Sequence, residues 1–414
     1  MPAQDIEACL RAEAGPLLAG LCRRFGSQHL ERAEDAVQAA LLRALESWPT
    51  RGWPDAPRAW LRTVATNALL EDLRRHGGTA LEAQLGPGGL EALPIDGLSC
   101  QPAAAEPPDP EDVLALLFAV SRAKVSQPGR IAFALRALLG FEVEQIAERM
   151  FATPASTYKR LERARAWWQV HRPDFAAPLG PARPGELADV HALLYTLFTE
   201  GYLPSVAAMD PDRGTCESAL RLAELLHERP LGRCPEGAAL CALMQLHLAR
   251  MAGRQDPGGD LLLLAEQDRG TWDRALIAAG LGWLERSASG EAVTRYHAEA
   301  GIAAEHALAP TYTATRWERI DELYGLLDSP IHRLNRAVAR AEWRGPLAGL
   351  SLLTEWAPPA WLLRSPWWPA VQADLHRRAG HRVEADRWTQ EALRSAQTPA
   401  IRALLARRLQ APAP

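Results

Sequence analysis

The chain has 414 residues, a formal net charge of −4 at pH 7 and a hydrophobic fraction of 48%. A chain of this length is too long for a domain with a single ordinary hydrophobic core, so we expect two or three domains. The slightly acidic balance excludes a basic coat over the whole surface, and any binding of nucleic acid must therefore be local.

Residues 1–77 are predicted to form a first helical domain. Within residues 33–48 the apolar side chains recur at helical spacing. The side chains expected to face inward are Val37, Ala40, Leu41, Ala44 and Leu45. Those expected to face outward are Asp35, Gln38, Arg43 and Glu46. The pattern is typical of an amphipathic helix that packs in a bundle.

A proline-rich loop, Pro49–Pro57, follows and carries Trp53. A second helix is predicted over Arg58–Arg75, with a buried face of Trp60, Leu61, Val64, Ala65, Ala68, Leu69 and Leu73. Its polar face is formed by Arg58, Arg62, Thr63, Thr66, Asn67, Arg74 and Arg75. Cations beside an aromatic loop suit a single DNA strand, because they can hold its backbone and an unstacked base. The alternative is that the tryptophans are core residues, which we favour for Trp60, whereas Trp53 is the better candidate for exposure.

Residues 78–110 are rich in glycine, proline and acidic residues and contain no lysine or arginine. They have no periodic apolar face, so we predict an extended or disordered linker. Residues 111–172 are predicted to form a second helical domain. Its entry helix carries Leu114, Leu117 and Val120, and its core helix carries Ile131, Ala132, Leu135, Leu138 and Leu139.

Residues 141–165 have the layout of a helix-turn-helix. Glu144–Met150 is the predicted first helix, Phe151–Thr153 the turn, and Pro154 the start of the second helix, with Thr153 as its N-cap. The side chains expected to face inward are Tyr158, Leu161 and Ala164, and those expected to face outward are Ser156, Lys159, Arg160 and Arg163. The outer face has the donors that phosphates and base edges of duplex DNA accept. The alternative is an ordinary helical hairpin with a solvated basic face.

Residues 173–186 form a proline-rich joint, and residues 187–414 are predicted to be helical to the end. Gly345 and Gly380 each stand between two predicted helices. Their separation is close to the roughly 34-residue period of tetratricopeptide repeats, in which a small residue lets paired helices approach.

Two polar groups in this half are candidate sites. The first is His227, Cys234, Cys241 and His247, whose spacings match no common zinc pattern, so we expect neither a metal nor another cofactor. The second is Glu200, Gln267, Asp268, Arg269 and Asp273. Because no nucleophile–base pair, phosphate-binding glycine loop or metal spacing accompanies this set, we favour Asp–Arg and Gln contacts that fix helix packing. We therefore predict no catalytic residue.

The six cysteines are scattered singly without a CxxC pair, as is common in a reducing cytosol. The acidic N-terminus has no secretory-signal pattern, and no apolar stretch reaches the length of a membrane span. We expect a cytoplasmic protein that does not bind membranes.

Several separate motifs together resemble one family. AEDAVQAALLRALESW (33–48) resembles the polymerase-binding helix of bacterial sigma factors, and PRAWLRTVATNALLEDLRR (57–75) resembles their helix that reads the minus-ten promoter element. EQIA (144–147) and STYKRLERAR (156–165) resemble the region of sigma factors that binds the minus-thirty-five promoter element. The segments TLFTEGY (196–202), QDRGTWDRALI (267–277), HAEAGIAAEHALA (297–309) and SPIHRLNRAVA (329–339) resemble the long tetratricopeptide-like extension of one subgroup of extracytoplasmic-function sigma factors.

This resemblance implies a sigma factor of the sigma-70 family that binds core RNA polymerase and promoter DNA. It implies polymerase contacts by Asp35, Gln38, Leu41 and Leu42. It implies minus-ten contacts by Trp53, Arg58, Arg62, Thr63 and Asn67, and minus-thirty-five contacts by Ser156, Thr157, Lys159, Arg160 and Arg163. The extension would regulate or stabilise the sigma domains, by direct contact or through a regulatory protein.

A second hypothesis stays open, in which the chain is a sigma-like adaptor whose repeat half binds a partner protein. It draws on Ala39, Leu41 and Glu142, where the sequence departs from the usual family pattern. It also draws on the segment FAVSRAKVSQPGR (118–130), which lacks the Cys-Cys-His-Pro run typical of the subgroup. Co-purification with core polymerase separates the two readings.

Overall fold

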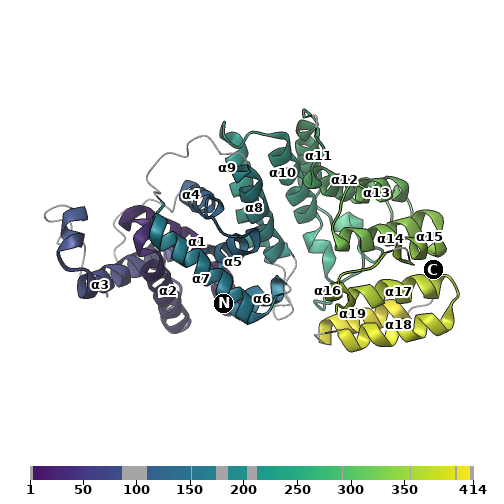
Figure 1. Ribbon diagram of the computed structural model, residues 1–414, viewed down its shortest axis with the longest axis horizontal. Helices are drawn as coiled ribbons and strands as arrows, with labels where there is room; N and C mark the ends of the chain where they lie inside the picture. Colours follow the sequence, from purple (N-terminus) through teal and green to yellow (C-terminus); the bar gives the residue numbers. More distant parts are fainter. Residues whose placement is uncertain are drawn as a thin grey trace. The chain divides into compact units, whose positions relative to one another are not determined.

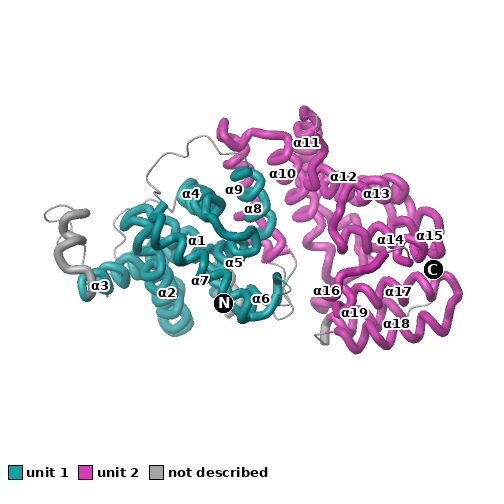
Figure 2. Tube along the Cα trace, viewed as in Figure 1, with its two compact units in different colours: residues 1–197 teal, residues 198–414 magenta. Residues whose placement is uncertain are grey.

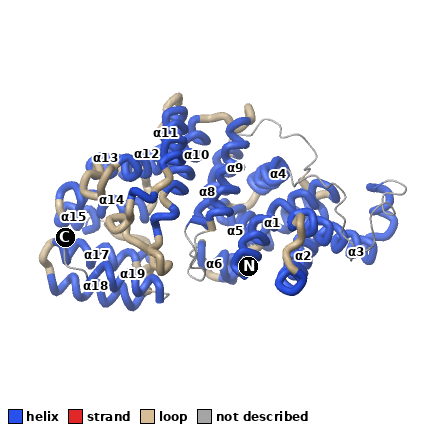
Figure 3. The backbone as a smooth tube through the Cα atoms, turned by 180° about the vertical axis from the view of Figure 1, so that it is seen from behind, coloured by secondary structure: helices blue, strands red, loops and turns tan. Residues whose placement is uncertain are grey.

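The computed structural model describes residues 3–85, 110–150, 152–173, 185–202, 212–290, 292–354, 356–396 and 399–410. In these ranges the chain forms helices joined by loops and contains no β-strand, which confirms the predicted all-α class (Figure 3). The chain divides into two compact units, residues 1–197 and residues 198–414 (Figure 2). The boundary between them falls inside one helix, α8 (Glu186–Tyr202).

The helices of the first unit, labelled in Figure 1, precede α8 in the chain. They are α1 (Ala3–Phe25), η1 (Ser27–His29), α2 (Leu30–Arg51), α3 (Pro57–Leu85), α4 (Pro110–Ser121), α5 (Gln127–Leu139), α6 (Val143–Arg149) and α7 (Pro154–His171). Helix α1 lies at the centre of this unit, because it contacts α2, α3, α4 and α5.

Helices α2 and α3 bury most of their predicted apolar faces. In α2, Val37, Ala40 and Ala44 are at most 3% exposed, and in α3, Leu61, Ala65, Leu69 and Leu73 are at most 1% exposed. Two predictions were wrong. Leu45 is 41% exposed, because it lies at the edge of the stripe rather than in it. Thr66 is buried, because α3 packs against both α1 and α2 and so buries a wider face than a single stripe.

Helices α4 and α5 of the second predicted domain pack against α1 of the first predicted domain. As predicted, Leu114, Leu117 and Val120 of α4 are at most 1% exposed. A Cβ added to Gly15 of α1 would lie 2.7 Å from the carbonyl oxygen of Leu138 in α5, so only glycine allows this close approach. The two sets of helices thus share one core, and residues 86–109 of the predicted linker lie outside the described residues.

The first turns of α8 also belong to this unit. Arg122 pairs with Glu186 at 3.2 Å, and Arg130 pairs with Asp189 at 2.9 Å. Val190 is fully buried on the same helix. The start of the predicted extension is therefore anchored on the helices that precede it.

The second unit continues from the end of α8. Its elements are α9 (Arg213–Glu228), α10 (Pro235–Ala249), η2 (Met251–Arg254), η3 (Arg269–Thr271), α11 (Arg274–Ser287), α12 (Arg295–Leu308), α13 (Trp317–Tyr324), α14 (Pro330–Arg344), α15 (Pro346–Thr354), α16 (Ala360–Leu363), α17 (Trp367–Arg378), α18 (Arg382–Ser395) and α19 (Pro399–Gln410). Helices adjacent in sequence pack against each other, as in the pairs α10–α11, α13–α14, α14–α15 and α17–α18. Such local packing is the pattern of helical arrays.

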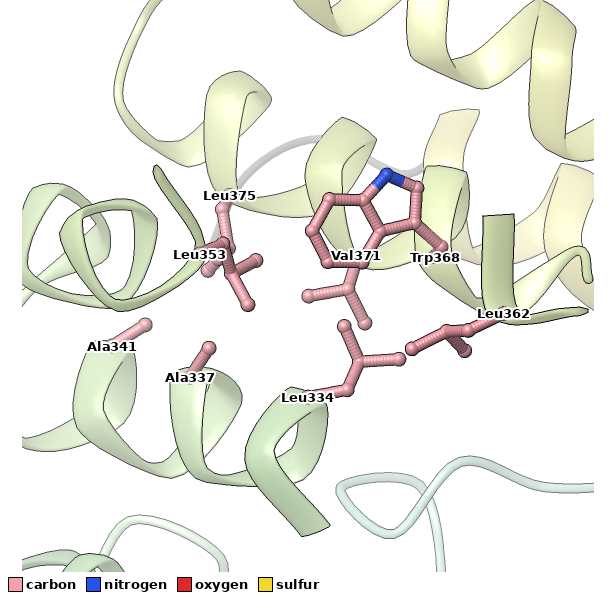
Figure 4. Close-up of a cluster of buried hydrophobic side chains, with 8 residues drawn as sticks. All are labelled: Leu334, Ala337, Ala341, Leu353, Leu362, Trp368, Val371 and Leu375. Carbon is pink, nitrogen blue, oxygen red and sulfur yellow. The ribbon is translucent and has the colours of Figure 1, made fainter. Parts of the chain in front are cut away.

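A hydrophobic cluster joins α14, α15, α16 and α17 (Figure 4). Its buried members are Leu334, Ala337, Ala341, Leu353, Leu362, Trp368, Val371 and Leu375. Close approach in this cluster depends on Gly349, whose added Cβ would lie 2.5 Å from the carbonyl oxygen of Ala337. The residues predicted for that role, Gly345 and Gly380, have open space around them. They turn the chain between helices with φ angles of +88° and +81°, which L side chains rarely adopt.

Candidate nucleic-acid interface

Local capping determines where α6 and α7 begin. The backbone N–H of Glu142 donates to Gln145 Oε1 at 3.0 Å, and the Glu142 carboxylate pairs with Arg136 at 3.0 Å. The Thr153 hydroxyl accepts from the backbone N–H of Ser156 at 3.2 Å, with Pro154 in the first turn, as predicted. Glu142 and Gln145 thus form a reciprocal capping box at the start of α6, with Glu142 in the N-cap position.

At the start of α7 the buried face includes Thr157 in place of the predicted Tyr158. Leu161 and Ala164 are buried as predicted, and Thr157 is fully buried in line with them. Tyr158, which we expected to face inward, is 63% exposed, and Thr157 cannot present its side chain to DNA. Both predictions were wrong. The buried residues Thr157, Leu161, Ala164 and Trp168 follow each other at intervals of four, three and four residues, and this helical spacing places Thr157 rather than Tyr158 on the buried face.

The exposed face of α7 is basic. Lys159 and Arg163 are exposed, and Arg160 and Ser156 are partly exposed beside them. Lys159 and Arg163 are four residues apart and therefore lie on one side of the helix, and Arg163 Nε donates to the backbone carbonyl of Lys159 at 3.1 Å. We call Lys159, Arg160 and Arg163 the α7 basic face. It offers cations and donors of the kind that phosphates and base edges accept.

The end of α7 is fixed to the segment around α2. Trp168 is 2% exposed, and its indole N–H donates to the carbonyl oxygen of Ser27 at 3.0 Å. Arg165 pairs with Glu34 at 2.9 Å, and burial raises the pKa of the Glu34 carboxyl although Arg165 opposes that shift. Arg165 is therefore engaged inside the unit and does not add to the α7 basic face.

Three tryptophans gather where α2 ends and α3 begins. The ring centroid of Trp48 lies 5.0 Å from that of Trp53 and 5.6 Å from that of Trp60. Trp48 is buried, Trp60 is half-buried and Trp53 is 37% exposed. The Trp53 ring thus packs against Trp48 and stays partly exposed. Its exposed part is an aromatic surface on which a base can stack.

The predicted polar face of α3 lies beside this aromatic group. Arg58 is largely exposed and pairs with the buried Glu13 of α1 at 2.6 Å. Burial raises the pKa of the Glu13 carboxyl, and Arg58 lowers it in part. Arg62, Thr63 and Asn67 are partly exposed, although the Thr63 hydroxyl donates to the carbonyl oxygen of Ala59 at 2.9 Å. Arg58 is already neutralised by Glu13, so any phosphate contact there has to compete with an internal carboxylate.

The residues predicted to contact polymerase lie on α2. Asp35 is exposed, Leu42 is 59% exposed, and Gln38 and Leu41 are half-buried. Leu45, which sequence reasoning assigned to the core, extends this surface with a second exposed leucine. An added Cβ on Gly140 would lie 3.2 Å from Gln38 Nε2, so the end of α5 covers part of Gln38.

The second polar group of the sequence has a structural role. Asp268 Oδ1 accepts from the backbone N–H of Gly270 at 2.8 Å, and Asp273 Oδ1 accepts from that of Ala275 at 2.9 Å. Both aspartates are exposed and cap the starts of helices. The Asp–Arg packing contacts that we expected from them were therefore a wrong prediction. Glu200 is partly exposed in α8.

Within the described ranges, no group of three or more His, Cys, Asp or Glu side chains is arranged to hold a metal ion. The same ranges contain no helix with both the length and the apolarity that a membrane crossing needs.

Comparisons with known proteins find relatives of both the first helices and the extension. Residues 10–79 match the sigma-70 region 2 family, and residues 186–288 match a family of unknown function, DUF6596. The chain is 34% identical over 363 residues to an uncharacterized protein of Rhizobium meliloti, covering 84% of this chain and 82% of that protein. It is 27% identical over 252 residues to the ECF RNA polymerase sigma factor SigG of two Mycobacterium tuberculosis strains, covering 55% of this chain and 67% of SigG. No solved structure matches the chain.

Proposed function

We propose, on the premise that the chain belongs to the sigma-70 family of sigma factors, that it binds core RNA polymerase and directs initiation at specific promoters. It also belongs to one family with the Rhizobium meliloti protein, since the two are similar over most of both chains. The observation that carries the proposal is the match to sigma-70 region 2 over residues 10–79, which includes all of α2. In this role the polymerase performs the chemistry, and the chain supplies recognition.

The α2 surface is the proposed contact with polymerase. Exposed Leu42 and Leu45 beside the acidic Asp35 give an apolar patch with a polar rim, which suits a protein partner. Because the end of α5 covers part of Gln38, only the exposed part of that side chain is available to polymerase.

The aromatic group and α3 are proposed to bind the minus-ten element as a single strand. Trp53 offers a stacking surface, and Arg62 and Asn67 on α3 offer donors to the strand. The α7 basic face and Ser156 are proposed to bind the minus-thirty-five element as duplex. Both surfaces are small, which suits a protein whose DNA affinity is completed by polymerase.

The tetratricopeptide-like second unit is proposed to regulate the first. Its only described covalent link to the first unit is α8, which continues from the residues paired with Arg122 and Arg130 into the second unit. A change in the second unit, or a regulatory protein bound to it, can therefore act on the helices of the first unit through this one helix.

Run-off transcription tests the proposal. The full chain is mixed with core polymerase and a promoter library, beside a Leu42→Asp and Leu45→Asp double variant. We expect specific transcripts from the unaltered chain and their loss in the variant, because two charges interrupt the apolar patch. A Leu326→Asp variant, which alters an exposed leucine of the second unit, is the matched control.

Two results would count against the proposal. If the unaltered chain neither co-purifies with core polymerase nor yields transcripts, the sigma-like adaptor becomes the better reading. If the double variant transcribes as well as the control, the α2 surface is not the polymerase contact.

A further inference from the structure

Three arginines in the second unit have no acidic partner among the residues that the structure describes. Arg250 and Arg269 are 9% and 8% exposed, and Arg254 is partly exposed. The guanidinium carbons of Arg250 and Arg269 both lie 5.0 Å from the ring centroid of Trp272, and that of Arg254 lies 4.1 Å from the ring centroid of Tyr202. We call these three side chains the arginine cluster.

The protein partners of the arginine cluster are neutral. Arg269 donates to the backbone carbonyls of His306 and Ala309 at 2.5 and 2.7 Å, and Arg254 donates to the carbonyl of Tyr202. No carboxylate in the described part of the chain pairs with any of the three arginines. Burial lowers the pKa of both Arg250 and Arg269, as expected where no counter-charge stabilises the cation.

Other arginines of the same unit are paired. Arg316 makes two hydrogen bonds to Glu305, at 2.7 and 2.9 Å. Arg336 and Arg340 share Asp321, at 3.2 and 2.6 Å. A buried cation without a counter-ion is costly, and the arginine cluster lacks the carboxylate partner that Arg316, Arg336 and Arg340 have.

Unsatisfied polar atoms gather at the same place. Arg250 Nε, Trp272 Nε1, His306 Nδ1 and His247 Nδ1 are buried and have no hydrogen-bond partner within the described ranges. Trp272 is 2% and His306 9% exposed. The ring of His247 lies 4.8 Å from the ring of Tyr202, the same ring that Arg254 covers. Buried polar groups in folded proteins are normally satisfied, so donors left unpaired beside unpaired cations point to an anionic ligand.

We propose that Arg250 and Arg269, with Trp272 and His306, bind the phosphate or carboxylate group of a small anion inside the second unit. Guanidinium groups match two oxygens of such a group. The indole N–H and an imidazole nitrogen can donate to the remaining oxygens of a phosphate or to the second lone pairs of a carboxylate. Because these side chains are at most 9% exposed, the ligand is a small molecule rather than a macromolecular surface. Arg254, which is partly exposed, adds a cation that solvent reaches.

Calorimetric titration of the full chain with inorganic phosphate at constant ionic strength tests this site. Glycerol phosphate and succinate are titrated in parallel, and they distinguish a phosphate ligand from a carboxylate ligand. We expect saturable binding of at least one of the three probes. Arg250→Met should weaken that binding at least about tenfold, because it keeps the length of the side chain and removes its charged donors.

Two further variants make the test decisive. Arg319→Met removes an exposed arginine of α13 that pairs with Glu322, and it should bind as the unaltered chain does. Arg250→Lys keeps the charge but not the planar donors, and it replaces Arg250→Met if circular dichroism shows that the latter is unfolded. A site that binds none of the probes, or that binds equally well after the Arg250 substitution, overturns the proposal. Since polymerase is absent from the assay, the result is independent of whether the chain directs transcription.

Discussion

Trp168 connects α7 to a segment far away in the sequence. Its indole N–H bonds to the carbonyl oxygen of Ser27, and its ring lies 5.3 Å from that of Phe133. No sequence pattern predicted this contact, because helical periodicity shows that a tryptophan is buried but not which distant carbonyl its N–H meets. Periodicity misplaced Thr157 and Tyr158 for a related reason, since a threonine and a tyrosine are both acceptable at the edge of a buried stripe.

Trp168→Phe should destabilise the first unit by about 0.5–1.5 kcal/mol, because it removes one hydrogen bond to the Ser27 carbonyl, which keeps the backbone N–H of Leu30 as a donor. Hydrogen exchange of α7 and α2 measures the effect within the full chain. Trp167→Phe is the matched control, since the Trp167 indole nitrogen has no hydrogen-bond partner among the described residues. Equal protection in the two variants would show that the hydrogen bond does not stabilise the unit.

Two buried imidazoles predict acid sensitivity of the second unit. Burial lowers the pKa of His247 and of His306 from 6.5 to about 3, and nearby Arg250 adds to both shifts. A histidine kept neutral by the fold contributes stability that is complete above its unfolded pKa and is lost as the pH falls below it. Each imidazole should therefore reduce stability by roughly 1.4 kcal/mol per pH unit as the pH falls from about 6.5 toward 3. Glu299 opposes the shift at His247, and Arg254 and Arg269 reinforce the shifts at His247 and His306 respectively.

Hydrogen exchange of α10 and α12 between pH 7 and pH 5, corrected for the intrinsic exchange rate, measures this loss. His247→Phe retains a ring beside Tyr202 and should make the pH dependence shallower. His171→Asn changes an exposed imidazole of the first unit and should leave these helices as they were. A pH dependence that is unchanged in His247→Phe contradicts the assignment.

At the scale of an element, α7 presents separable functions on two faces. Its buried face fixes the helix, and its basic face is the surface proposed to bind DNA. Lys159→Ala or Arg163→Ala should weaken binding of the polymerase complex to its promoter and reduce the salt slope by about one for each phosphate that the variant no longer neutralises. Fluorescence anisotropy over a range of salt concentrations measures both. Lys124→Ala, an exposed lysine outside α7, should leave the slope unchanged, and an equal reduction there would mean that the effect is not specific to α7.

Element starts were the most predictable part of the fold, because capping is local in sequence. Thr153 and Pro154 identified the start of α7 correctly. In contrast, sequence reasoning placed the extension after α7 and gave no reason for Glu186 and Asp189 to pair with Arg122 and Arg130. Ion pairs between helices depend on tertiary packing, which periodicity does not encode.

The Arg130–Asp189 pair tests whether α8 is anchored on the first unit. Both side chains are at most 24% exposed, so the pair should be stronger than a surface ion pair. A double-mutant cycle with Arg130→Gln and Asp189→Asn should give a coupling energy of about 0.5–3 kcal/mol, read from hydrogen exchange of α8. The exposed Arg75–Glu71 pair of α3 is the control and should couple by no more than about 0.5 kcal/mol. Equal coupling in the two pairs would argue against anchoring.

At the scale of the whole molecule, the position of the unit boundary within α8 decides how the extension should be removed. A chain that ends after Tyr202 keeps the interactions of Glu186, Asp189 and Val190 with the first unit, whereas a chain that ends after Arg172 lacks these residues. The longer of the two chains should therefore be the more stable, and it isolates the contribution of the second unit from that of α8. If the second unit regulates the first, transcription by the chain that ends after Tyr202 should differ from that of the full chain at equal polymerase occupancy. Identical transcript yields would exclude regulation by the second unit and leave it a separate binding function.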